Sequence, residues 1–191
     1  ALVSGNSPFD KWYYNGESNA ISKSAKRGFK IFSGKGNCTA CHLVNEEYAL
    51  FTDEKLHNTG IGFKSSMYVE PPRKKVVLAP GIEVDVDTSV YANDSAFRDE
   101  IMPNDLGLYL ITQDPNDRWK IRTPQLRNVE LSGPYMHNGQ LSTLKEVVEF
   151  YNQGGVTEVG KMKNETISPL MFPLNLTCLL YTSPSPRDLQ G

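Results

Sequence analysis

Cys38-Thr39-Ala40-Cys41-His42 is the stretch that decides how this chain of 191 residues is interpreted. Two cysteines separated by two residues and followed directly by a histidine form the pattern of c-type haem attachment. Each cysteine sulfur bonds one vinyl group of the haem, and the histidine then lies where its imidazole can bind the iron. We therefore expect one haem c on Cys38 and Cys41, with His42 as the proximal ligand of the iron.

Zinc binding or a disulfide is the alternative use of two cysteines at this spacing. A zinc ion would need two further ligands, for which the sequence offers His57, His137 and Cys178. His57 stands in a polar, turn-prone stretch, and a loop histidine held by a hydrogen bond is the simpler interpretation of it. The histidine directly after Cys41 favours haem over zinc.

Charge and hydropathy exclude several classes of partner. With 20 Lys and Arg against 22 Asp and Glu, the formal net charge is -2, so no basic field attracts nucleic acid or anionic lipid. No stretch approaches the roughly 20 apolar residues of a membrane span. Residues 1–4 do not form a signal peptide. Because bacteria attach haem to cysteine outside the cytoplasm, we expect a periplasmic protein whose leader was removed, or a piece of a longer chain.

The residues before the haem motif predict an amphipathic helix. From Ser22 onward, an apolar stripe recurs at helical spacing, and the helix is expected to end near Gly34 and Gly36. The stripe consists of Ala25, Phe29 and Phe32. We interpret it as a packing surface that leads the chain into the motif.

Residues 71–90 change in character and predict a small β-hairpin insertion. Two short apolar stretches, 76–79 and 82–86, flank the turn-forming pair Pro80-Gly81. The acidic residues of the second stretch do not have the spacing of an EF-hand loop, so a solvated strand face is the preferred interpretation.

A second helix is predicted after residue 143. Thr143 and Glu146 form a capping box, and Gly154-Gly155 is expected to close the helix. One face carries Leu144, Val147, Val148 and Tyr151. Tyr151 therefore points inward, where its hydroxyl needs a partner, and in a haem protein the iron is one candidate.

Residues 178–191 break the pattern of the chain. The stretch from Cys178 to Asp188 resembles an in-frame translation of a sequencing adapter. We expect the natural sequence to end near Thr177, Cys178 to have no biological meaning, and a final helix expected after Leu174 to be missing.

Several motifs together resemble the C-terminal haem domain of the bacterial diheme cytochrome c peroxidases and their MauG-type relatives. The motifs are Ser7-Pro8-Phe9-Asp10, residues 38–42, Leu56-His57-Asn58-Thr59-Gly60, Asp105-Leu106-Gly107, Thr123-Pro124-Gln125-Leu126-Arg127-Asn128, Pro134-Tyr135-Met136-His137-Asn138-Gly139 and the helix to Tyr151. The resemblance covers nearly all of the chain to Thr177 and is weakest from Lys64 to Asp99.

The resemblance implies a mainly α, cytochrome c-like haem domain with long loops and a small β-hairpin insertion. Residues 1–17 would be the connector from a missing N-terminal haem domain. Residues 18–177 would be the c-type haem domain without its C-terminal helix, and residues 178–191 a non-native tail.

The resemblance also implies a function. In that family the N-terminal haem meets hydrogen peroxide, and the six-coordinate C-terminal haem relays electrons or stores oxidising equivalents. The expected partners are the N-terminal haem domain of the same protein and a small redox protein as electron donor, or a protein substrate. No catalytic residue is expected in this fragment, which should be inactive alone. A stand-alone monohaem cytochrome that only carries electrons is the alternative function, and a zinc-stabilised domain is a third.

Two sets of metal ligands remain open. Family peroxidases place a methionine at the helix position that matches Tyr151, whereas MauG-like relatives place a tyrosine there. Tyr151 is therefore the expected distal iron ligand, with Met136 as the alternative. The family's interdomain calcium would take backbone carbonyls that correspond to Ser132 and Pro134 in this chain.

Overall fold

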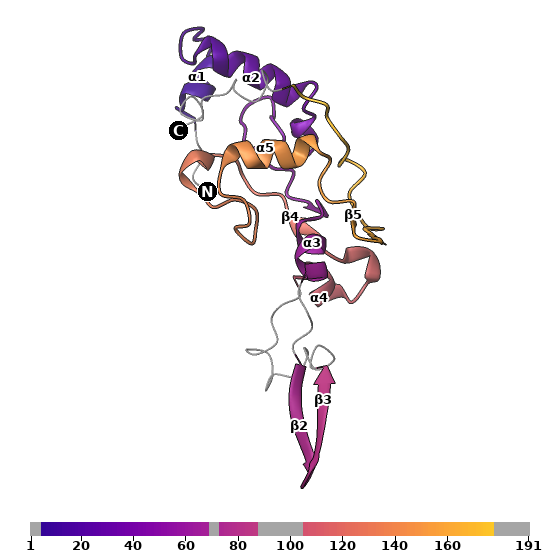
Figure 1. Cartoon of the computed structure of the whole chain (residues 1–191). Helices are drawn as coiled ribbons and strands as arrows, with labels where there is room; N and C mark the ends of the chain where they lie inside the picture. The colour runs from indigo at the N-terminus through magenta and orange to yellow at the C-terminus, as the bar shows by residue number, and fades with distance from the viewer. Residues whose placement is uncertain (1–4, 69–72, 88–104, 178–191) are drawn as a thin grey trace.

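The computed structural model of the chain describes residues 5–68, 73–87 and 105–177 (Figure 1). The expected non-native tail, 178–191, and its Cys178 lie outside the described residues. So do residues 1–4 of the expected connector and residues 69–72 and 88–104 on either side of the predicted hairpin.

The helices are short. The α-helices are α1 (Pro8–Tyr13), α2 (Lys23–Ser33), α3 (Ile61–Tyr68), α4 (Tyr109–Thr112) and α5 (Leu144–Asn152). Single 3-10 turns are η1 (Cys38–Ala40), η3 (Pro115–Asp117) and η4 (Val129–Leu131). Both predicted helices are confirmed with their caps. Ser22 accepts a hydrogen bond at the start of α2, Gly34 ends it, and the Thr143–Glu146 capping box begins α5.

The strands form three antiparallel pairs. β1 (Leu56–His57) pairs with β4 (Ile121–Arg122), and β5 (Glu158–Val159) pairs with β6 (Met162–Lys163). β2 (Arg73–Ala79) and β3 (Ile82–Asp87) form the hairpin that the sequence predicts, with Val76 opposite Val84. Leu78 at its tip is 67% exposed, as fits a ribbon that projects away from the other elements (Figure 1).

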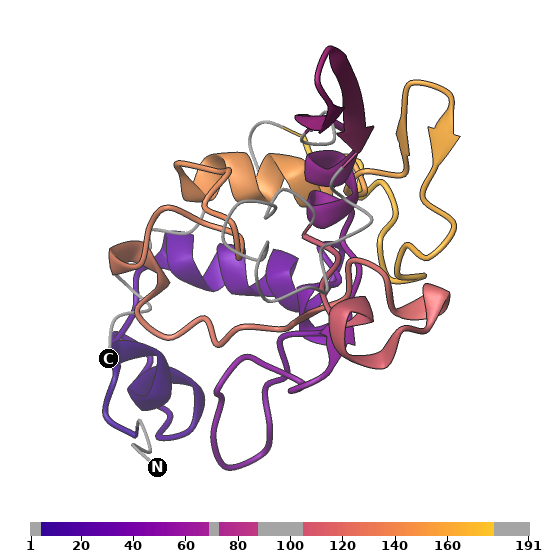
Figure 2. The same ribbon diagram turned by 90° about the horizontal axis from the view of Figure 1, so that it is seen from below.

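Loops make up most of the described chain, so the mainly α expectation overstates the helix content. Helices α2 and α5 run alongside each other in two perpendicular views, with α1 at one end and α3 at the other (Figures 1 and 2). Twelve prolines and fifteen glycines interrupt the sequence, and this limits the length that regular elements can reach. None of the helices in the described part is long and apolar enough to cross a bilayer.

The core around α1 and α2 is aromatic. Phe9, Ala49 and Phe51 are its buried residues. Phe29 on α2 lies 5.3 Å from the Phe9 ring, and Phe32 lies 6.1 Å from Phe51, measured between ring centroids. The predicted stripe on α2 is therefore a packing surface. Because Phe9 is fully buried, α1 belongs to this core.

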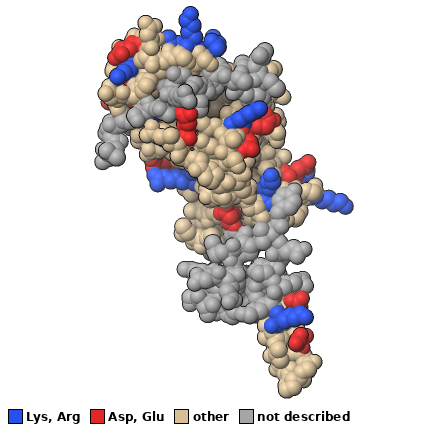
Figure 3. Space-filling view, turned by 60° about the vertical axis from the view of Figure 1, so that its left-hand side comes forward, with Lys and Arg blue, Asp and Glu red and all other residues tan. Residues whose placement is uncertain are grey.

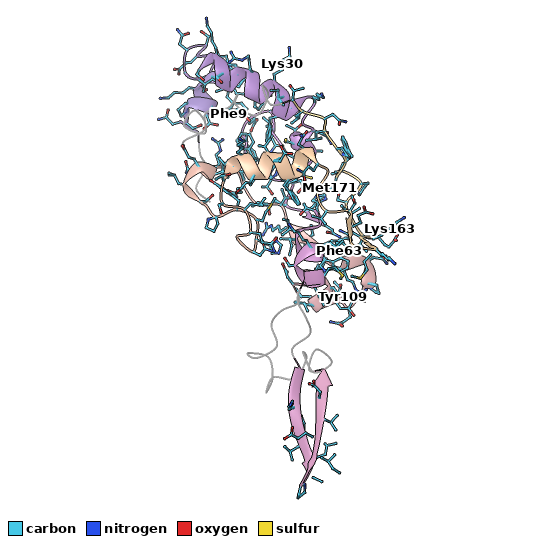
Figure 4. The ribbon with its side chains drawn as sticks, in the orientation of Figure 1. Phe9, Lys30, Phe63, Tyr109, Lys163 and Met171 are labelled. Atoms are coloured by element: carbon cyan, nitrogen blue, oxygen red, sulfur yellow. The ribbon has the colours of Figure 1, made fainter. Side chains whose placement is uncertain are left out.

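A second, smaller core lies around α3. Phe63 and Trp119 pack edge to face with centroids 5.0 Å apart, and the Trp119 indole donates a hydrogen bond to Ser66 Oγ at 3.0 Å. Figure 4 shows Phe9 and Phe63 at opposite ends of the part of the molecule that excludes the hairpin. On the face seen in Figure 3, basic and acidic side chains are interspersed.

A buried guanidinium ties α1 to the rest of the domain. Arg127 donates to both carboxylate oxygens of Asp10, at 2.7 and 3.0 Å, and to the Ala49 carbonyl at 2.7 Å. It also lies over the rings of Phe9 and Phe51. Burial by itself raises the pKa of Asp10, but hydrogen bonds from Arg127 and Ser7 outweigh it and lower the pKa. The pair is therefore ionised at neutral pH.

We predict that Arg127→Met destabilises the domain by about 3–5 kcal/mol, because it leaves the buried Asp10 carboxylate without its countercharge. Denaturant unfolding of the haem-loaded protein measures the change. Arg122→Met is the matched control: Arg122 pairs with Glu54, but their side chains are 66% and 53% exposed, so its loss should cost less than about 1 kcal/mol. Equal losses in the two variants would contradict the buried-pair explanation.

Candidate haem site

The turn that carries the two cysteines follows directly from α2. The Gly36 N–H donates to the Ile31 carbonyl at 2.7 Å, and the His42 N–H donates to the Cys38 carbonyl at 2.8 Å. A Cβ atom on Gly36 would lie 2.8 Å from the Ile31 oxygen and 3.3 Å from Cys38 Sγ, so a side chain there would collide with the turn. The 3-10 turn η1 therefore brings Cys38, Cys41 and His42 together on one short segment.

Both cysteines are free thiols. Burial, helped by the neighbouring Cys41, raises the pKa of Cys38 to about 11. Burial and the charge of Asp53 raise the pKa of Cys41 as well. Reactive redox cysteines have lowered pKa values. Neither Cys38 nor Cys41 shows that lowering.

His42 is held in the tautomer that an iron ligand requires. Its Nδ1–H donates to the Phe51 carbonyl at 2.7 Å, which leaves the Nε2 lone pair free. Burial lowers the pKa of His42, and the carbonyls of Phe51 and Pro124 oppose this only in part. The imidazole of His42 is therefore neutral, and the Phe51 carbonyl orients it.

The carbonyl that orients His42 belongs to a residue with an uncommon backbone. Phe51 has a φ of 56°, in the left-handed region that bulky residues rarely adopt. Its ring packs in the aromatic core against Phe9 and beneath the Arg127 guanidinium. The burial of this ring holds the strained backbone in place, and that backbone in turn aims the carbonyl at His42.

Tyr151 lies on α5. Burial is the main cause that raises the pKa of Tyr151 to about 12, with smaller contributions from Cys41 and Cys38. Two glycines allow the end of α5 to pack closely against a neighbouring segment. Cβ atoms on Gly155 and Gly60 would lie 2.3 Å from the Thr59 oxygen and 2.4 Å from the Val156 oxygen, respectively. The end of α5 therefore packs against the 58–60 segment at backbone distance.

Several residues of the 132–139 loop have partners in other segments of the chain. Met136 is half-buried with a φ of 66°, and Ser132 and Pro134 are exposed. Calcium takes six to eight oxygen ligands, so the two carbonyls would supply only part of a site. His137 pairs with Asp105. The loop is linked to α3, where Asn138 and Gln140 both donate to Ser65 Oγ.

His57 is hydrogen-bonded, as the simpler interpretation of its sequence context expected. Its Nε2 lies 2.8 Å from Asp53 Oδ2, and its Nδ1 lies 3.5 Å from Ser168 Oγ. Asp53 was not predicted as the partner of His57. The two residues are four positions apart, but His57 lies in a strand, and this spacing predicts a contact only within a helix. The Phe51 carbonyl was not predicted either, since a backbone group leaves no mark in the sequence.

Known proteins resemble the chain in sequence. The chain is 39% identical over 205 residues to the cytochrome-c peroxidase IdrP2 of Denitromonas iodatirespirans, a match that spans 98% of the chain and 50% of that relative. It is 32% identical over 154 residues to the methylamine utilization protein MauG of Methylorubrum extorquens, across 81% of the chain and 32% of that relative. No family model matches.

Two solved structures share the fold. A MauG-like protein associated with microbial copper homeostasis superposes with a TM-score of 0.63 at 23% identity, over 98% of this chain and 49% of that one. The diheme peroxidase BthA of Burkholderia thailandensis gives a TM-score of 0.55 at 21% identity, over 96% of this chain and 43% of that one.

The fold and the sequence likeness thus define a cytochrome c-like domain. The chain belongs to the diheme cytochrome c peroxidase and MauG family of oxidoreductases, and it spans about half the length of the curated relative IdrP2.

We predict that the chain, expressed with a cytochrome c maturation system, carries haem that acid-acetone extraction does not remove. The free thiols at Cys38 and Cys41 provide the two attachment points. Cys41→Ala should leave attachment at one vinyl group only, visible as a shifted haem absorption band. Haem that washes out of the unaltered protein, or an unchanged band in Cys41→Ala, would contradict the assignment.

Proposed function

We propose that this chain is the electron-transfer half of a periplasmic diheme cytochrome c peroxidase or MauG-like oxidase. One haem c, attached through Cys38 and Cys41, would supply a redox-active iron with His42 as its proximal ligand. The half would relay electrons to a peroxide-reactive haem in an N-terminal domain, or store oxidising equivalents for it. The observation that carries the proposal is the imidazole of His42, which directly follows the motif's two free thiols and is oriented by the Phe51 carbonyl.

The residues of the chain perform distinct tasks in this proposal. The Phe51 carbonyl keeps the Nδ1 proton of His42 in place and so keeps Nε2 available for the iron. Tyr151 would be the second protein ligand of the iron, and peroxide would then find no open site here. An anionic phenolate favours the ferric state, whereas a thioether such as Met136 favours the ferrous state and raises the reduction potential. Tyr151 therefore suits the storage of oxidising equivalents, and Met136 would suit simple electron delivery.

The proposed partners follow from the family. They are an N-terminal haem domain of the same protein, where hydrogen peroxide would react, and a small redox protein or a protein substrate. Calcium at the Ser132 and Pro134 carbonyls would need further ligands from another domain. A stand-alone electron carrier remains the second candidate, because one haem motif and its surroundings are enough for that task.

We predict little peroxidase activity from the haem-loaded chain alone, because His42 and Tyr151 would both bind the iron and leave peroxide no place there. Steady-state oxidation of a dye by hydrogen peroxide measures this. Tyr151→Ala removes the distal ligand and should raise the activity. The proposal fails if the unaltered chain turns over peroxide as fast as an intact peroxidase of the family.

We predict that Tyr151→Phe changes the ferric spectrum and raises the reduction potential, since it removes an anionic ligand. Met136→Leu should leave both unchanged. Absorption and resonance Raman spectra with a potentiometric titration measure the two effects. If only the methionine variant changes the spectrum, then Met136 is the ligand and the MauG-like interpretation loses its main support.

A further inference from the structure

A carboxylate lies beside one of the two sulfurs that would attach the haem. Asp53 and His57 each place a polar side-chain atom within 4.8 Å of Cys41 Sγ. Cys38 has a different setting, because its thiol donates to the Gly36 carbonyl. A thioether keeps the sulfur of Cys41 on the same Cβ atom, so the Asp53 carboxylate would stay close to the edge of a haem joined there.

The Asp53 carboxylate is ionised and little exposed to water. Its side chain is 5% exposed, and its two oxygens accept hydrogen bonds from His57 Nε2 at 2.8 Å and from the Lys55 N–H at 3.0 Å. The Thr123 side chain also hydrogen-bonds to it. Burial by itself raises the pKa of Asp53, but the hydrogen bonds outweigh it and hold the pKa at about 2. A full negative charge therefore remains here at neutral pH.

His57 orients this carboxylate without cancelling its charge. While Nε2 donates to Asp53, the other ring nitrogen, Nδ1, lies 3.5 Å from Ser168 Oγ, a hydroxyl that can donate to it. One proton on the imidazole therefore serves both contacts, and the Asp53–His57 pair keeps a net negative charge. Pairing of β1 with β4 fixes the backbone of His57 opposite Ile121.

The charge of Asp53 reaches the groups that would hold the haem. It adds to the rise that burial causes in the pKa of Cys41. Together with the Phe51 hydrogen bond, it opposes the fall that burial causes in the pKa of His42. Lys55 acts on Cys41 in the opposite direction and more weakly, and its side chain is exposed, so salt screens its charge more strongly.

A fixed negative charge beside a haem shifts its redox equilibrium in a known direction. Ferric haem carries one positive charge more than ferrous haem, so a neighbouring carboxylate stabilises the ferric form and lowers the reduction potential. Two unit charges roughly 10 Å apart, at an effective dielectric constant of about 20, interact strongly enough to shift an equilibrium about tenfold. This effect does not depend on whether Tyr151 or Met136 is the distal ligand.

We propose that Asp53 sets the reduction potential of this domain: its carboxylate, held beside Cys41 by His57, lowers the potential of the attached haem and favours the ferric state. The inference rests on the proposed function, because it requires haem at Cys41. In this role Asp53 binds neither iron nor substrate, and its charge alone acts. The direction suits a haem that stores oxidising equivalents, because it is the direction in which an anionic phenolate ligand also acts.

The test uses the full chain expressed with a cytochrome c maturation system, and it measures the ferric/ferrous midpoint by spectroelectrochemical titration. Asp53→Asn keeps the shape of the side chain and should raise the midpoint by about 59 mV, which is a tenfold change for a one-electron couple. Asp85→Asn is the matched control and should leave the midpoint unchanged. It removes the same charge from β3, in the exposed hairpin that projects away from the other elements (Figure 1). Because the Asp53 side chain is buried, the shift in Asp53→Asn should persist in about 1 M salt.

Three further variants separate charge from local structure. Asp53→Glu keeps the charge, and His57→Gln keeps an N–H donor for the carboxylate, so both should stay near the midpoint of the unaltered chain. Lys55→Gln removes an exposed positive charge and should lower the midpoint in about 0.01 M salt but not in about 1 M salt. This surface variant tests the inference even if Asp53→Asn takes up no haem.

The outcomes separate this inference from the proposed function. An unchanged midpoint in Asp53→Asn, or an equal rise in Asp85→Asn, would overturn the inference while the proposed function stands. A midpoint that falls in His57→Gln as far as it rises in Asp53→Asn would mean that the pair is neutral, and would overturn it too. So would a rise in Asp53→Asn that comes with altered axial ligation in the ferric spectrum and no fall in Lys55→Gln. An unaltered chain that acquires no covalent haem would overturn the proposed function itself.

Discussion

The buried Arg127 guanidinium is the contact on which the other features of the domain depend. It neutralises Asp10 on α1, donates to the Ala49 carbonyl and covers the rings of Phe9 and Phe51. An arginine suits this position because its fork of donors can serve a carboxylate and a carbonyl at the same time. Phe51, held beneath it, gives its own carbonyl to His42. The ion pair is thus linked to His42 through a single aromatic residue, Phe51.

The candidate haem site draws on segments that are far apart in the chain. The turn after α2 supplies the thiols and His42, the 51–57 segment supplies the orienting carbonyl, and α5 carries Tyr151, the proposed distal ligand. Contacts between backbones hold these segments together. Gly155 and Gly60 allow the end of α5 to approach the 58–60 segment, and the buried Asn58 side chain bonds to Asn164 and Thr166 across the same junction. These contacts keep the two segments from sliding past each other. A shift, or a larger side chain in place of either glycine, would leave buried polar groups without hydrogen-bond partners.

The surroundings of Cys41 and Cys38 differ, although both cysteines belong to the same motif. The Cys38 thiol donates to the Gly36 carbonyl within its own turn, whereas Cys41 lies near Asp53 and His57.

Several elements depend only on residues that are neighbours in the sequence, and these elements could be predicted from the sequence. The Cys-x-x-Cys-His motif, the Ser22 and Thr143 caps, the helix end at Gly34 and the hairpin turn at Pro80-Gly81 each depend on a few neighbouring residues, and the structure has these helices and this hairpin where they were predicted. The tertiary structure alone decided the rest. The short helices with long loops, the partner of His42, the Asp10–Arg127 pair and the meeting of Asp53 with Cys41 arise between segments whose approach is fixed by burial and by backbone hydrogen bonds. Neither periodicity nor spacing in the sequence predicts such contacts. Every residue has a backbone carbonyl, so the carbonyl that binds His42 cannot be recognised from its residue type. The strained φ of Phe51 persists only because of the packing around its ring.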